Sequence, residues 1–144
     1  MYLNRLYNNI QMRFAEIDSS HFPVVIVRIN PVNATLAEAS VHMVEALQFV
    51  RSQTEKFVAI YDLTHVKQVS PEIRLAFGKW VNAHQDEFKG QVAGIAYVSS
   101  SLIASLALKT IFLIAPPPTP HYVVLGNLPE AVSWAHTVME GQKD

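Results

Sequence analysis

The chain contains no cysteine. This absence excludes disulfide bonds, thiol catalysis and metal sites with cysteine ligands. Charge of one sign is also scarce: 11 basic and 12 acidic residues give a formal net charge of −1 at pH 7, without a block of like charges. Nucleic-acid grooves and polybasic membrane-binding segments concentrate positive charge. We therefore expect neither a nucleic acid nor a charged membrane surface as a partner.

Long hydrophobic runs are missing as well. The first residues, MYLNRLYNNIQMRF, lack the run of roughly 7 to 15 apolar residues that a signal peptide requires. The longest apolar stretch, Leu102 to Ala115, is interrupted by Ser105, Lys109 and Thr110. It is also shorter than the ~20 residues that span a bilayer. We predict a cytoplasmic protein without a membrane-spanning helix.

The chain does contain enough apolar side chains for one hydrophobic core. Half of its 144 residues are hydrophobic, which is typical of a globular domain that folds without metals or disulfides. The sequence shows neither an internal repeat nor an interdomain linker. Residues 1–144 are therefore expected to form a single domain.

The first half of the sequence predicts a hairpin, a helix and a central strand. Residues 10–17 alternate in polarity, and a turn at Asp18–Ser20 is expected to lead into a strand over 24–29. Apolar residues recur at helical spacing over 35–52, with His42 expected on the polar side. The run 57–61 is apolar on both faces, as in a strand that helices cover on both sides.

The second half predicts three helices and two strands. Ser70, Pro71 and Glu72 are typical of a helix start, and Gly90 is expected to cap the end of that helix. A strand over 91–98, a helix over 102–115, an edge strand over 122–125 and a final helix up to residue 139 follow. The order β-β-α-β-α-β-α-β-α predicts an α/β fold with a mixed, mostly parallel five-stranded sheet.

The C-terminal block KTIFLIAPPPTPHYVVLGNLPEAVSWAH joins a helix, a proline-rich turn, an edge strand and a last helix. With the order of elements, this block resembles the STAS-like, or SpoIIAA-like, family, and the resemblance covers most of the chain. It implies a single STAS-like regulatory domain of bacterial type, within a fold class that includes lipid-binding CRAL-TRIO-like domains. The matching residues are Pro116, Pro117, Pro118, Pro120, His121, Glu130, Ala131, Trp134 and Ala135.

The anti-sigma factor antagonists of this family are phosphorylated at the start of the helix after the third strand, within a D-S-S-G motif. The corresponding stretch here is Ser70-Pro71-Glu72-Ile73. Pro71 stands at the phosphoserine position and the glycine of the motif is absent. Thr64 and Ser70 are the hydroxyl residues that remain in this loop.

The same loop is the candidate partner-binding site. It follows the central strand, at the sheet edge where open α/β folds bind ligands, and loops carry function disproportionately. The alternative interpretation is structural: Ser70 caps the helix, Asp62 tethers the loop backbone, and the other residues are solvated. We predict a non-enzymatic regulatory domain that binds a protein partner through Asp62, Thr64, His65, Lys67, Ser70 and Arg74.

The sequence carries no motif for catalysis or metal binding. Its six histidines include no pair four residues apart and no H-E-x-x-H motif, and no glycine-rich phosphate loop or G-x-S-x-G elbow is present. We therefore predict no catalytic residue, no metal and no cofactor.

The helix expected over 102–115 is apolar around more of its circumference than the ~100° arc that packing on a sheet requires. Deep burial would explain the excess. A homodimer surface, or the wall of a pocket for an apolar ligand such as a lipid, would explain it as well. Binding of a small apolar ligand is therefore the alternative function. The candidate residues of such a pocket or interface are Phe77, Trp80, Lys109 and Phe112.

Overall fold

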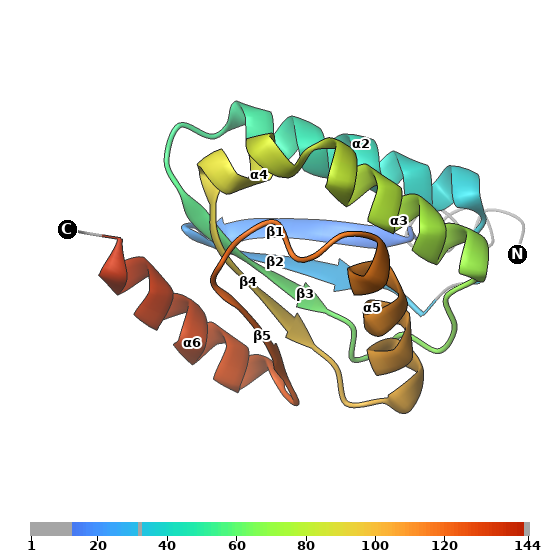
Figure 1. Ribbon diagram of the computed structural model, residues 1–144. Coiled ribbons are helices and arrows are strands. Elements are labelled where there is room, and N and C mark those ends of the chain that lie inside the picture. Colours follow the sequence, from blue (N-terminus) through green and yellow to red (C-terminus); the bar gives the residue numbers. More distant parts are fainter. Residues whose placement is uncertain (1–12, 32, 143–144) are drawn as a thin grey trace, which may run out of the picture.

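A five-stranded sheet forms the centre of the computed structural model, which describes residues 13–31 and 33–142 (Figure 1). The strands lie in the order β1-β2-β3-β4-β5. β1 is antiparallel to β2, and the remaining neighbours are parallel. This confirms the predicted α/β fold with a mixed, mostly parallel sheet. The strands are β1 (Ala15–His21), β2 (Val24–Ile29), β3 (Phe57–Asp62), β4 (Val92–Val98) and β5 (Tyr122–Leu125).

Within the described residues, five helices connect and cover these strands: α2 (Leu36–Ser52), α3 (Pro71–Ala83), α4 (Gln85–Gln91), α5 (Leu102–Ile114) and α6 (Leu128–Gly141). Four of them begin after a side chain that accepts a hydrogen bond from the first turn, as N-cap residues do. These caps are Thr35, Ser70, Ser101 and Asn127. Over the part of the chain that the structure describes, no helix is both long and apolar enough to cross a membrane.

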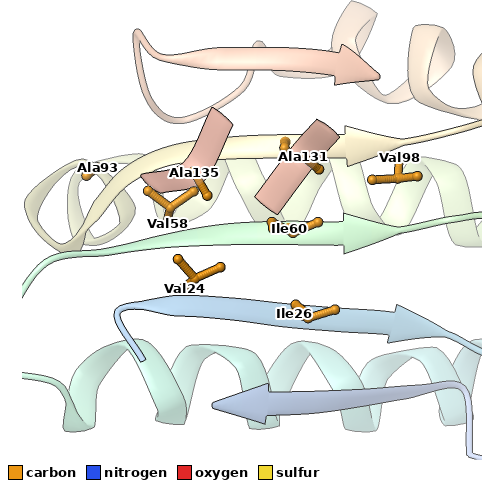
Figure 2. Packing of buried hydrophobic residues seen from close by; sticks show 9 residues of the cluster. Val24, Ile26, Val58, Ile60, Ala93, Val98, Ala131 and Ala135 are labelled. Carbon is orange, nitrogen blue, oxygen red and sulfur yellow. The ribbon is translucent and has the colours of Figure 1, made fainter. Parts of the chain in front are cut away.

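Helix α6 packs closely on one face of the sheet (Figure 1). Ala131 and Ala135 are fully buried against β-strand side chains such as Val58 and Ile60 (Figure 2). Gly94 of β4 permits this approach, because a Cβ atom there would lie only 3.0 Å from Cη2 of Trp134. Small residues on α6 and on β4 therefore allow the helix to pack closely on the sheet.

The opposite face of the sheet is covered by α2, α3, α4 and α5, with larger side chains between helices and strands. Within this layer α3 crosses α5 at Gly78. A Cβ atom at Gly78 would lie 2.6 Å from Cβ of Ile114. A residue without a side chain is thus required where the two helices meet.

The first strand differs from the prediction. β1 continues through the residues expected to form the turn, and the chain reverses at Phe22–Pro23 instead, where the peptide bond is cis. Asp18 is therefore a strand residue. It binds Arg28 of β2 at 3.1 Å and accepts hydrogen bonds from Ser20. Residues 10–12 of the predicted strand lie outside the described part of the chain.

The helix predicted between Ser70 and Gly90 is divided in two. The backbone leaves helical geometry at His84, with φ −120° and ψ 22°, so that α3 ends and α4 begins there. Phe88 is nevertheless buried, with its ring 5.1 Å from that of Trp80. The predicted cap at Gly90 is wrong, since Gly90 lies inside α4 and does not have a positive φ.

Candidate ligand-binding cavity

An apolar cavity of about 140 Å³ lies between the sheet and its multi-helix layer. Val25, Ala59 and Ile95 contribute to it from three neighbouring strands. Helices α2, α3 and α5 contribute residues such as Phe49, Trp80 and Ala107 on the other side. All of the residues that line the cavity are apolar or aromatic, and none is charged.

Aromatic residues from several elements meet around this cavity. The Tyr97 ring lies 5.3 Å from that of Phe112 and 6.1 Å from that of Tyr61, and Phe77 lies 6.0 Å from Trp80. Phe77, Trp80 and Phe112, which the sequence indicated for a pocket or interface, all line the cavity. Lys109 does not line it and is exposed on α5.

The sizes of the lining residues explain why the space is unfilled. Bulky rings on α3, α5 and the strands hold the helices away from the sheet. Four other lining positions are alanines, which cannot reach across the resulting gap. The arrangement contrasts with the α6 side, where Ala131 and Ala135 pack on the strand side chains and Gly94 makes room for the ring of Trp134. The four alanines are Ala46, Ala59, Ala104 and Ala107.

The loop after β3 forms part of the cavity wall. Leu63, Val66 and Val69, spaced three residues apart, all contribute to the lining. Only the polar residues of this loop were predicted to form a binding site. The regular spacing of its apolar residues was the feature that would have revealed the inward-facing side.

Three of the loop residues proposed for partner binding have structural contacts. Asp62 is only 8% exposed and accepts hydrogen bonds from the backbone N–H and the hydroxyl of Thr64. Ser70 caps α3 by accepting from the N–H of Ile73 at 3.2 Å. Arg74 donates to Thr110 of α5 at 3.3 Å. The structure thus supports structural roles for Asp62, Ser70 and Arg74.

The other three candidates, Thr64, His65 and Lys67, are exposed. They lie together in the loop at the C-terminal end of β3, as predicted. The polar candidates therefore divide into two groups. Asp62, which is buried, and Ser70 and Arg74, which are half-buried, fix the loop and the start of α3. The other three are exposed, although the Thr64 hydroxyl also donates to Asp62.

Few polar groups reach the cavity. The lining side chains that carry one are Tyr61, Tyr97 and Trp80. Burial raises the pKa of both tyrosine hydroxyls well above the usual value, and for Tyr97 the neighbouring Tyr61 and Tyr122 act in the same direction. Both hydroxyls are therefore neutral at physiological pH.

His42 contacts Tyr61, and its predicted position on the polar side of its helix is wrong. It was expected on the polar side of its helix, but it is 2% exposed and surrounded by the rings of Phe14, Tyr61 and Phe77. The burial arises because this side of α2 faces α3 as well as the sheet. Burial lowers the pKa of His42 to about 4, against a smaller opposing effect of Glu45. Its spacing with Ala39 and Ala46 was the feature that would have placed it inside.

Among residues 13–31 and 33–142, no group of three or more histidine, aspartate and glutamate residues is arranged to hold a metal ion. The comparisons with known proteins add no assignment: no family model matches the chain, and a search of the curated proteins found no match. The resemblance to the STAS-like family remains a prediction.

Proposed function

We propose that the protein binds a small apolar molecule in the cavity between the sheet and helices α2, α3 and α5. The observation that carries this proposal is a space of about 140 Å³ lined by uncharged, almost entirely apolar side chains. Ligand sites typically combine an apolar wall with a few polar groups, here those of Tyr61, Tyr97 and Trp80. This is the alternative function from the sequence analysis.

The energetics of packing support a ligand. Protein interiors contain few spaces larger than a water molecule, because each unfilled volume forfeits contacts. A space of about 140 Å³ that is partly open to the surface leaves its lining side chains with fewer packing contacts, which costs free energy. A bound apolar molecule would recover part of this free energy.

The volume also limits the size of the ligand. An apolar protein cavity of roughly 150 Å³ holds one benzene molecule. We therefore propose a ligand near that size, or one apolar group of a larger molecule, in place of a complete lipid.

Native mass spectrometry of the purified protein, before and after mild denaturation, tests for a molecule that is already bound. Titration with toluene, followed by NMR, tests the cavity directly. In the variant Ala107→Leu the added side chain would occupy the space, and we expect toluene affinity to fall at least tenfold. Lys109→Ala, on the exposed side of the same helix, should bind toluene as the wild type does.

The proposal is wrong if the wild type carries no ligand and does not bind toluene. It is also wrong if folded Ala107→Leu binds toluene as tightly as the wild type. Urea unfolding establishes that each variant is folded, and Ala104→Val provides a second way to fill the cavity from α5.

A second candidate function is self-association through α5, the homodimer surface that was one of the explanations for this apolar helix in the sequence. Its support is a set of exposed apolar side chains on this helix: Leu102, Ile103, Leu106 and Leu113, of which Leu113 is 88% exposed. A net charge of −1 opposes contact between two copies only weakly. Sedimentation over a range of concentrations tests for a homodimer. If this surface is used, Leu106→Ser should weaken association, whereas a monomer at all concentrations would contradict self-association.

A further inference from the structure

The polar groups of the cavity differ in whether they have a partner. The Tyr61 hydroxyl lies 3.4 Å from Nε2 of His42. For the Tyr97 hydroxyl, the described residues provide no hydrogen-bond partner. Tyr97 is held by contacts of its ring, which stacks on the ring of Tyr61 and packs edge to face with that of Phe112. The ring contacts thus fix Tyr97 in the cavity wall, and its hydroxyl has no protein partner in the described residues.

No charge reaches the cavity at neutral pH. The lining residues include no lysine, arginine, aspartate, glutamate or histidine. His42, which contacts Tyr61 and Phe77 of the wall, has its pKa lowered to about 4 by burial and is neutral. Arg74 and Lys109 of the neighbouring helices do not line the cavity. Arg74 donates to Thr110, while its Nε is buried without a partner in the described residues, and Lys109 is exposed.

Such a site discriminates strongly against ions. An ionised group that moves from water into an apolar cavity loses its solvation free energy. Without a partner of opposite charge, contacts with apolar side chains do not compensate for this loss. A neutral hydroxyl or carbonyl group loses much less and regains it through one hydrogen bond.

We propose that the ligand is an uncharged molecule with an apolar body near the size of a benzene ring and one hydrogen-bonding group, which pairs with the Tyr97 hydroxyl. This inference rests on the proposed function, since it identifies the chemical class of the ligand for the same cavity. It distinguishes neutral alcohols, phenols and ketones from carboxylates and amines of the same shape.

Four probes of nearly equal size test the proposal: toluene, benzyl alcohol, benzoate and benzylammonium, each titrated into wild-type protein at pH 7. We expect benzyl alcohol to bind at least 100-fold more tightly than either ion. This comparison requires no variant, so it does not depend on the folding of a mutant. Benzoate or benzylammonium binding within a factor of ten of benzyl alcohol would overturn the inference.

The role of Tyr97 is tested with Tyr97→Phe. Loss of one hydrogen bond should weaken benzyl alcohol about three- to tenfold and change toluene less than twofold. Tyr122→Phe is the matched control, because Tyr122 lies outside the cavity lining and is half exposed. Equal effects of Tyr97→Phe on both probes would contradict the pairing.

The two proposals fail in different ways. If none of the four probes binds, the proposed function itself is wrong. If toluene binds and Ala107→Leu blocks it, but the ions compete equally with benzyl alcohol, only the assignment of a neutral ligand is wrong.

Discussion

The Nε2 atom of His42 lies 3.4 Å from the hydroxyl of Tyr61, where α2 meets β3. His42 is enclosed by aromatic rings, and its Nδ1 has no hydrogen-bond partner within the described residues. A charged imidazolium is unfavourable in this environment. The pair therefore couples the stability of the fold to the protonation of a histidine.

The first prediction concerns this pH dependence. The unfolded chain protonates His42 near pH 6.5, whereas the folded chain does so only near pH 4. Between these values the unfolded state binds more protons, so acidification lowers the free energy of unfolding. We expect His42 to contribute a loss of about 2 kcal/mol between pH 7 and pH 5, measured by urea unfolding.

His42→Phe should remove this part of the slope, while His136→Ala, at an exposed position of α6, should retain it. Between pH 7 and pH 5, the carboxylates with shifted pKa values contribute little to the change in stability. Asp18 and Glu87 have pKa values lowered to about 2 by hydrogen bonds to Ser20 and Arg51, so they act only below about pH 4.5. An unchanged slope in His42→Phe would contradict the assignment.

The second prediction concerns the crossing of α3 and α5. Gly78→Ala places a Cβ atom 2.6 Å from Cβ of Ile114. The clash should outweigh the gain in helix propensity of about 1 kcal/mol, leaving the variant about 1 to 2 kcal/mol less stable in urea unfolding. Ile114→Ala in the same chain should reduce the effect of Gly78→Ala.

Gly90→Ala is the matched control, since Gly90 is also helical and a Cβ atom there meets nothing within 4 Å. Helix propensity should then stabilise the protein by about 0.5 to 1 kcal/mol. Equal stabilisation by both substitutions would show that the helices do not cross as described.

The third prediction separates the two groups of loop residues. Asp62→Ala removes the acceptor for the N–H and hydroxyl of Thr64 and should lower stability by about 1 to 3 kcal/mol. Asp62→Asn keeps one acceptor and should cost less. His65→Ala, at an exposed position in the same loop, should change stability by less than about 0.5 kcal/mol. A similar loss in His65→Ala would mean that exposed residues also hold the loop.

Much of the fold was predictable because it depends on nearby residues. The starts of α3, α5 and α6 follow from Ser70, Ser101 and Asn127, each of which accepts a hydrogen bond within its own first turn. The alternation of strands and helices then restricts the sheet to few arrangements. The errors occurred where distant residues decide. β1 ends at His21 because of its pairing with β2, and His42 is buried because Phe77 and Phe14 lie over it.

The candidate site was predictable only in part for the same reason. An excess of apolar residues on one helix indicated that Phe112 and its neighbours had a further use, and Phe77, Trp80 and Phe112 do line the cavity. The cavity itself depends on the difference between the rings that separate the layers and the alanines that do not fill them. That difference involves eight helices and strands and the loop after β3, so no local pattern reveals it.

The two edges of the sheet have unequal consequences for assembly. The edge at β1 carries Glu16 and Asp18 and an irregularity between Asp18 and His21, features that discourage another strand from pairing. The edge at β5 has no charged residue, and Tyr122 and Val124 are exposed there. Only its short length of four residues and the preceding Pro120 limit pairing of this edge with a strand of another molecule. Aggregation by strand addition would therefore start at β5, and lengthening or charging that strand would alter solubility more than the same change at β1.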